Sequence, residues 1–293
     1  REAMQAEADQ ILEQISQIRE SIKYDNQNLY YKENNGVQTA ATKSSRSLSR
    51  ASARVSPLAS VLEGAEAFAG GETRTITIDG VQYTVKNKLT TANDLSYSKD
   101  TSTGELTLIA SNFEIRGQSD VAHNLIISGK SNSIYGGDLA DTIEELNSNC
   151  SNNNIYGGAG NDTIILRGGS SAYGEEGDDI FIAYSGVCYG GIGNDTITRY
   201  GGSGVSYGGE GDDVFNIYSS NAKYFGEEGN DTFNIIGSLS GIVIDGGSGT
   251  NNVTGEVGSN TTINVVGANS GSVSLVSGEE QSVMINGINY TVS

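Results

Sequence analysis

Several residue types that functional sites often need are scarce in this chain. Its 293 residues include no tryptophan, one proline, two cysteines and one histidine. The single histidine, His123, excludes zinc sites that need two histidines and argues against a His-based catalytic triad, so we expect it in a turn. Cys150, in a polar turn, and Cys188 suggest two free thiols. Because no GxSxG, HExxH, phosphate-loop or paired CxxC motif occurs, no catalytic residues are predicted and the chain is not expected to be an enzyme.

Positive charge and long apolar runs are scarce as well. There are 17 Lys and Arg residues against 36 Asp and Glu, a formal net charge of −19, which argues against a nucleic-acid partner. No stretch approaches the roughly 18 apolar residues of a membrane-spanning helix. No signal peptide is recognisable and the first residues look like the middle of a helix, so we expect a fragment of a longer protein.

Glycine, in contrast, is abundant, and part of it belongs to a repeat. The same phrase occurs five times, as YGGAGNDTI at 156–164, YGEEGDDIF at 173–181, YGGIGNDTI at 189–197, YGGEGDDVF at 207–215 and FGEEGNDTF at 225–233. The seventh residue of each copy is an aspartate. These aspartates are separated by 17, 16, 18 and 18 residue numbers: Asp162, Asp179, Asp195, Asp213 and Asp231. Such a period predicts stacked coils, in which glycine turns precede short β-branched strands.

Aligning the copies predicts which way the side chains point. The apolar residues after each aspartate should stack inward as one ladder, at Ile164, Phe181, Ile197, Phe215 and Phe233. A second inward ladder is expected on the opposite strands, at Ile155, Ala172, Cys188, Ser206 and Tyr224. An outward aromatic ladder is expected at Tyr135, Tyr156, Tyr173, Tyr189, Tyr207 and Phe225. The outward ladder is interpreted as cover for the sheet, with a glycan- or surface-contacting strip as the alternative.

The aspartates create an electrostatic problem that a cation would solve. Stacking places equivalent carboxylates about 4.8 Å apart. At an effective dielectric near 20 they repel by roughly 3–4 kcal/mol before salt screening. Carboxylates and turn carbonyls are hard oxygen ligands, which suit Ca²⁺ better than zinc. We therefore predict calcium between successive loops, the alternative being a metal-free solenoid whose Asn, Gly and Asp turns face water.

These residues resemble the RTX (repeat-in-toxin) nonapeptide GGxGxDxUx over about residues 134–251. The resemblance implies a β-roll with about four calcium sites, in which the five aspartates are side-chain ligands and the glycine loops supply carbonyls. Those glycines are Gly157, Gly160, Gly174, Gly177, Gly190, Gly193, Gly208, Gly211, Gly226 and Gly229. The chain departs from the family at Glu175 and Glu227, which replace the second glycine. It also carries the phrase on only one half-turn per coil, which predicts one calcium edge and one plain edge.

Weaker copies flank the run. Residues 135–141 keep the aromatic, the glycines and a final Asp141, which is a possible further ligand, whereas residues 245–251 end in Asn251. The predicted fold class is therefore mainly β, a parallel β-roll or β-helix solenoid with coils of about 17 residues and one calcium edge. The solenoid is assigned to residues 113–255, and strands or a hairpin cap to 256–293.

The N-terminal region has helical patterns. Met4, Ala8, Ile11, Ile15, Ile18 and Ile22 form a heptad seam, so residues 1–34 are predicted as a coiled-coil-like helix that needs another helix or subunit through residues 4–22. Residues 7–31 resemble the end of the N-terminal coiled-coil helix of bacterial flagellins, the alternative being an unrelated amphipathic helix. Residues 35–55 form a Ser/Ala/Arg-rich linker.

Residues 56–112 are predicted to contain a capping helix and a β-hairpin. Ser56 and Pro57 are typical of a helix start, and Leu58, Val61, Leu62, Ala65 and Phe68 give an apolar face. TIDGVQYTV at 77–85 and MINGINYTV at 284–292 are hairpin signals that bracket the solenoid. They are interpreted as hairpins that close its two ends or as duplicated modules.

Together these patterns predict an extracellular, secreted or surface-exposed structural or adhesion-type module whose folding calcium stabilises. Its partners would be calcium ions and cell-surface glycans or proteins. Two alternatives remain: a flagellin-like filament subunit with a solenoid insertion, and the calcium-binding accessory domain of a larger secreted enzyme.

Overall fold

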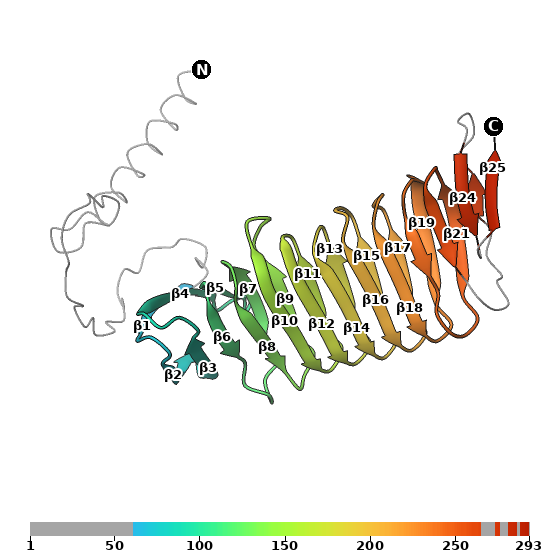
Figure 1. The fold of residues 1–293 in the computed structure, drawn as a ribbon. Coiled ribbons are helices and arrows are strands. Elements are labelled where there is room, and N and C mark those ends of the chain that lie inside the picture. The colour runs from blue at the N-terminus through green and yellow to red at the C-terminus, as the bar shows by residue number, and fades with distance from the viewer. Residues whose placement is uncertain (1–60, 265–272, 276–280, 286–287, 293) are drawn as a thin grey trace, which may run out of the picture. The chain divides into compact units, whose positions relative to one another are not determined.

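A computed structural model describes residues 61–264, 273–275, 281–285 and 288–292, all within Val55–Ser293, one of two compact units of the chain. The described residues form β-strands and loops without a helix, wound as a parallel β-solenoid (Figure 1). This confirms the predicted fold class for the repeat region. The predicted helix of 1–34 and the linker of 35–55 lie outside the described residues. No described helix is long and apolar enough to serve as a membrane span.

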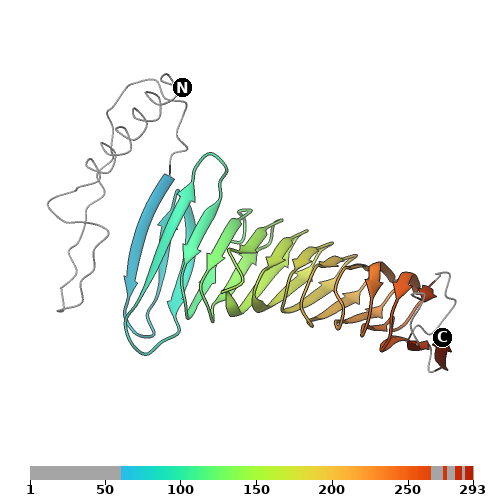
Figure 2. The ribbon, with the colours of Figure 1, turned by 90° about the horizontal axis from the view of Figure 1, so that it is seen from above.

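Two sheets face each other along the stack. Sheet 1 contains, in spatial order, β1 (Val61–Phe68), β4 (Asn93–Asp100), β5 (Leu106–Ile109), β7 (Asn124–Ser128), β9 (Thr142–Glu145), β11 (Thr163–Leu166), β13 (Ile180–Ala183), β15 (Thr196–Arg199), β17 (Val214–Ile217), β19 (Thr232–Leu239), β21 (Asn252–Val257) and β23 (Val273–Leu275). Sheet 2 contains β2 (Thr73–Ile78), β3 (Val81–Asn87), β6 (Phe113–Arg116), β8 (Ser133–Gly137), β10 (Ser151–Ala159), β12 (Gly169–Glu176), β14 (Val187–Ile192), β16 (Val205–Glu210), β18 (Lys223–Glu228), β20 (Val243–Asp245), β22 (Thr261–Asn264), β24 (Gln281–Ile285) and β25 (Ile288–Val292). Figure 2 shows the coils following one another from the blue N-terminal strands to the red C-terminal ones.

The core confirms both predicted inward ladders. Alternation along each strand places one residue between the sheets and the next outside. Parallel pairing keeps the register, so that Phe181 lies beside Ile164 and Ile197. Every member of the two inward ladders is fully buried, including Ser206 and Cys188. One continuous apolar core therefore runs along the solenoid axis.

Side chains on the outer face of sheet 2 confirm the aromatic ladder. The rings from Tyr135 to Phe225 stack with centroids 4.5–5.0 Å apart and interplanar angles of 1–14°. Arg116 covers the open face of the first ring, with its guanidinium carbon 3.6 Å from the Tyr135 centroid. The ladder thus exposes ring edges and hydroxyl groups, because the faces between neighbours are occupied.

The ends of the described stack are β-strands, which corrects one prediction. Residues 61–68 form strand β1, antiparallel to β4, and not the predicted capping helix. Phe68 is buried, but Val61 and Leu62 are 50% and 43% exposed, so the apolar spacing does not define one buried helical face. Pairing with β4 continues the sheet and satisfies backbone groups that a helix would have had to satisfy internally.

Both predicted hairpins are present at the two ends of sheet 2. β2 and β3 pair antiparallel around Asp79 and Gly80, whose φ values of 51° and 79° suit a tight turn. β24 and β25 pair antiparallel at the other end. The predicted boundary at residue 113 is close, since parallel pairing starts with β5 and β7.

The cysteines are both free, as predicted, but Cys150 is not in an exposed turn. It is buried, and its Sγ lies 3.3 Å from the Ile127 carbonyl oxygen. Cys150 thus packs against the preceding coil through its side chain. The sequence did not predict this burial, because the residues on either side of Cys150 are polar.

Candidate metal centre: a column of buried aspartates

The repeated aspartate lies at the turn from sheet 2 to sheet 1. Strand β12 ends at Glu176, Gly177 makes the turn, and Asp179 immediately precedes β13. The same arrangement recurs in each coil, so the carboxylates form a column at one edge. All six side chains are 0–2% exposed: Asp141, Asp162, Asp179, Asp195, Asp213 and Asp231. The turns do not present these carboxylates to water, in contrast to the metal-free alternative.

One oxygen of each carboxylate joins a hydrogen-bond ladder along the column. The backbone N–H of Asp162 donates to Asp179 Oδ1 at 2.7 Å, and that of Asp179 donates to Asp195 Oδ1 at 2.7 Å. Asp141, Asp195 and Asp213 donate in the same way to the next coil, at 2.7–3.0 Å. The ladder links each coil to the following one and holds the carboxylates in register.

The other oxygen has no donor. Oδ2 of all six aspartates is buried and without a hydrogen-bond partner. Buried polar atoms are normally paired, and an unpaired charged one is especially costly. Six equivalent exceptions in successive coils indicate a property of the repeat rather than a local defect.

The first glycine of each phrase makes room for this oxygen. A Cβ added to Gly157 would collide with Asp162 Oδ2 and lie 2.9 Å from the Gly174 carbonyl oxygen of the next coil. The same relation recurs at Gly174, Gly190, Gly208 and Gly226. A carboxylate oxygen and a main-chain carbonyl oxygen thus border the space that each glycine leaves free.

The glycine at the fifth position of each phrase closes the turn. Gly177, Gly193, Gly211 and Gly229 have φ values of 132–136° and Gly160 has 103°, a region that other residues rarely adopt. A Cβ on Gly177 would collide with the Gly160 carbonyl oxygen of the preceding coil. The structure therefore brings all ten predicted loop glycines to the aspartate column, with oxygen atoms stacked closely from coil to coil.

Burial raises the pKa of these carboxylic acids well above their usual range. It raises the pKa of Asp213 to about 8, a shift that the Asp195 N–H opposes and the nearby carboxylates increase. The same causes bring the pKa of Asp162 and Asp195 to about 7. The pKa of Asp179 and Asp231 rises to about 6, again mainly by desolvation. Without a counter-charge, the column does not hold all its negative charge at neutral pH.

The column has two different ends. At the first, the backbone N–H of His123 donates to Asp141 Oδ1 at 2.6 Å, while its ring is buried and its Nδ1 lies 3.3 Å from Tyr83 Oη. His123 is thus a buried residue at the head of the column rather than a simple turn residue. At the other end, Asn251 Oδ1 accepts the Asp231 N–H at 2.8 Å. An amide can therefore replace the carboxylate in the ladder.

A second ladder runs outside the first, and the sequence analysis missed it. It consists of the residues that precede the buried aspartates: Asn161, Asp178, Asn194, Asp212 and Asn230. From Asp178 onward, each backbone N–H donates to the side-chain oxygen of the equivalent residue in the preceding coil, at 2.7–3.1 Å, the direction opposite to that of the buried ladder. The strict alternation of Asn and Asp at one repeat position is the signal that could have revealed it, because it keeps like charges two coils apart.

The donor set at the column consists of few side chains and many carbonyls. Among the described residues, no three His, Cys, Asp or Glu side chains converge on a point that could hold a metal ion. An ion at the column would have to use one or two carboxylates and main-chain oxygens, an all-oxygen set of the kind that Ca²⁺ accepts. The unpartnered Oδ2 atoms and the space beside the first glycines fit such an ion.

Comparisons with other proteins give no further guide, since no family model, curated protein or solved structure matches the chain.

Proposed function

We propose that the aspartate column binds calcium between successive loops and that calcium stabilises the solenoid. The observation that supports this proposal most directly is the set of six buried Oδ2 atoms without a donor. A proton or a cation can neutralise such an atom. At neutral pH a cation neutralises the aspartate carboxylate of every coil, whereas a proton neutralises only those carboxylates whose pKa exceeds the ambient pH.

Each part of the repeat has a role in this proposal. The Oδ1 ladder fixes the carboxylates, so that the Oδ2 atoms are positioned before any ion arrives. The first glycine keeps space open beside Oδ2, and the turn carbonyls border it. Ca²⁺ supplies positive charge that offsets repulsion within the column and turns an unfavourable stack of buried carboxylates into a favourable one.

Thermal unfolding of the full chain in EGTA and in 10 mM CaCl₂ tests this function. For sites of the weak extracellular class, with a Kd of about 1 mM, this concentration stabilises by about 1.4 kcal/mol per site. Four such sites would raise Tm by roughly 10–20 °C. Magnesium at the same concentration is the control, because it requires a tighter octahedral shell. Equal Tm values in EGTA and in calcium would contradict the proposal.

The cellular setting follows from the same argument. Sites of this class fill at millimolar extracellular calcium and stay empty at cytosolic levels, so we propose a secreted or surface-exposed structural module that completes its folding outside the cell. The filament-subunit alternative depends on residues 7–31, which lie outside the described residues. The accessory-domain alternative depends on chain beyond the sequence described here.

A further inference from the structure

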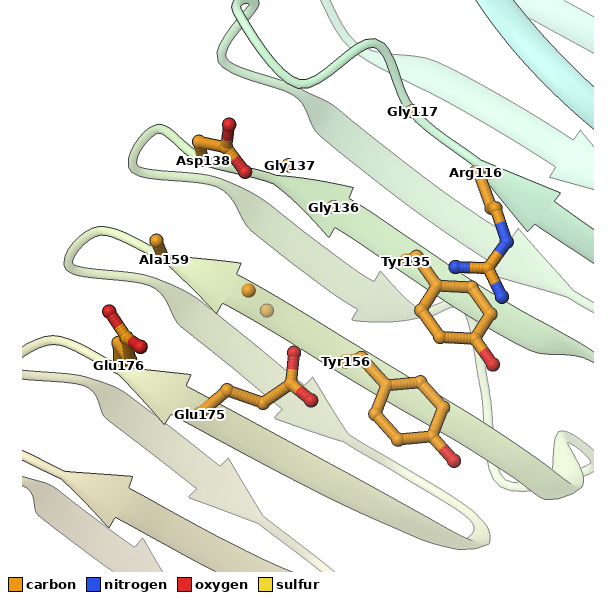
Figure 3. A pocket seen from close by; sticks show the side chains of 12 residues that line it. Arg116, Gly117, Tyr135, Gly136, Gly137, Asp138, Tyr156, Ala159, Glu175 and Glu176 are labelled. Carbon is orange, nitrogen blue, oxygen red and sulfur yellow. The ribbon is translucent and has the colours of Figure 1, made fainter.

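The two outer strands of sheet 2 differ from its inner strands. An inner strand has a neighbour on each side, as Figure 3 shows where Arg116 of β6 lies over Tyr135 of the adjacent β8. Among the described residues, β2 and β25 have one neighbouring strand each (Figure 1). Each of them therefore has one edge of backbone N–H and C=O groups without a strand beside it, and such edges are templates for pairing with another chain.

The hairpins that contain these two edges are versions of one module. The first hairpin is β2–β3, with the sequence TIDGVQYTV, and the second is β24–β25, with MINGINYTV. Their strands pair in the same register, since Ile78 lies opposite Val81 in the first and Ile285 lies opposite Ile288 in the second. Strand β2 thus corresponds to β24, and β3 corresponds to β25.

The edge that is open in one hairpin is occupied in the other. β3 pairs antiparallel with β6, so the open edge of β25 corresponds to an edge that is bound to the start of the solenoid. β24 pairs parallel with β22, so the open edge of β2 corresponds to an edge that is bound to the end of the solenoid. Each open edge therefore matches the opposite end of the solenoid rather than its own.

The strand directions agree with a head-to-tail contact in both sheets. In sheet 2, β2 runs in the direction of the parallel strands and β25 runs against them, so β25 of one copy would lie antiparallel to β2 of the next. In sheet 1, β1 and β23 run in the same direction, as neighbouring coils do. The alternation of both sheets can thus continue from one molecule into the next.

Charge differs between the two ends in the same sense. The first hairpin and β4 contain Arg74, Lys86 and Lys99, whereas no Lys or Arg follows Lys223 in the sequence. Contact between two second hairpins would bring acidic segments together, which like-charge repulsion disfavours. Head-to-tail contact instead places basic residues of one end beside the acidic segment of the other.

We propose that copies of this chain associate head to tail, with β25 of one copy pairing antiparallel with β2 of the next. The partner is a second copy of the same chain, bound by backbone hydrogen bonds across the two open edges. Because such a contact uses different surfaces on the two copies, each bound copy still has one open edge. The contact therefore produces open chains or rings rather than closed dimers.

The backbone groups at the open edge of β2 follow from the register. In a hairpin with a two-residue turn, the residues that flank the turn exchange hydrogen bonds, and such pairs alternate along the strands. Thr75 and Thr77 belong to the other pairs, so their N–H groups point to the open edge. Gln82, opposite Thr77, shows this alternation, because its N–H donates away from β2 to Gln118 Oε1 at 3.2 Å.

Sedimentation velocity of the full chain in calcium, over a dilution series, tests this inference. The original chain should form species larger than a dimer, which dissociate on dilution. Thr75→Pro and Thr291→Pro, at equivalent outward positions of β2 and β25, each remove one N–H and should weaken self-association at least about tenfold. An equimolar mixture of the two variants should form a dimer and nothing larger, because each supplies the edge that is intact only in itself.

The controls separate this contact from others. Thr75→Val and Thr291→Val keep the N–H and should associate like the original chain. If a proline variant lowers Tm, Thr77→Pro or Asn289→Pro takes its place at the neighbouring outward position of the same strand. A monomeric original chain would overturn the inference. Dimers of each proline variant alone would show that like edges pair, and undiminished association of Thr75→Pro/Thr291→Pro would place the contact elsewhere, as in residues 4–22; either result would overturn it as well.

Discussion

The buried carboxylates at the two edges of the solenoid have opposite hydrogen-bond environments. At the edge where sheet 1 returns to sheet 2, the fully buried Glu145 accepts hydrogen bonds from the Asn153 side chain and the Gly168 backbone N–H, at 3.0 and 2.8 Å, and from Arg167 N–H and the Ser170 hydroxyl. Both its oxygens have donors. At the aspartate edge, one oxygen per coil has none.

This difference teaches what the unpartnered oxygens mean. The same chain, with the same coil geometry, supplies a buried carboxylate with several donors where no repeat phrase is present. The absence of donors at the aspartate edge is therefore not imposed by the solenoid. It belongs to the repeat phrase, whose first glycine also lets Oδ2 and a carbonyl oxygen of the next coil approach its backbone closely, and it is the expected environment of a cation site.

The largest expected effect comes from pH, which acts on the aspartate edge. The usual pKa of Asp is 3.8, and the buried carboxyls of Asp162, Asp195 and Asp213 have pKa values of about 7 to 8. The folded state thus holds more protons than the unfolded state between about pH 4 and pH 8, and the metal-free protein loses stability as pH rises across this window. Urea unfolding in EGTA at pH 5 and pH 8 should show this loss, and calcium should abolish most of it. A metal-free stability that rises from pH 5 to pH 8 would be incompatible with buried, unpartnered carboxyls.

Two glycines with different surroundings, one at each edge, test the comparison between the edges. Gly190→Ala places a Cβ against Asp195 Oδ2 and the Gly208 carbonyl oxygen, whereas a Cβ at Gly169, near the opposite edge, meets nothing within 4 Å. We expect Gly190→Ala to destabilise by more than about 3 kcal/mol and Gly169→Ala to stay within about 0.5 kcal/mol of the original. Urea unfolding measures both. Similar values for the two substitutions would show that space beside Oδ2 is not needed.

Breaking the opposite edge should cost nearly as much. Glu145→Ala leaves buried donors of Asn153, Gly168 and Ser170 without their acceptor, which costs about 3 kcal/mol. The loss should be the same in EGTA and in calcium, because this edge contains no part of the proposed sites. A calcium-dependent loss would show that the two edges are not independent. Chemical unfolding in both media measures it.

The smallest expected effect changes sign with calcium. Asp195→Asn keeps the ladder, since Asn251 shows that an amide accepts the same hydrogen bond, but it removes one buried charge. In EGTA at pH 8 it should stabilise by about 1–3 kcal/mol, and in calcium it should destabilise. Asp212→Asn changes an exposed residue of the same turn, at a ladder position where other coils have Asn, and should be nearly neutral in both media. Identical behaviour of the two variants would remove the distinction between the inner and outer ladders.

The repeat period was sufficient to predict the solenoid, both inward ladders and the tyrosine ladder. Side chains one period apart must lie in register in stacked coils, so aligning the phrases fixes their direction. Val61–Phe68 could not be assigned in this way, because its apolar spacing fits a helix and its pairing with β4 is decided by distant residues. The hydrogen bonds to Glu145 could not be predicted for the same reason, because their donors lie later in the chain and meet Glu145 only after the coils stack. The position of the aspartates was predicted, but their burial and their donor-free oxygen emerge only from the packed turns.

Equilibrium dialysis against ⁴⁵Ca²⁺ tests the central claim most directly, because it counts ions without reference to stability. The original chain should bind about four ions, one in each gap between the five repeat loops. Asp195→Asn, which borders two gaps, should lose about two of them, and Asp212→Asn should lose none. No binding at millimolar calcium, or full binding by Asp195→Asn, would contradict the assignment of calcium to the aspartate column.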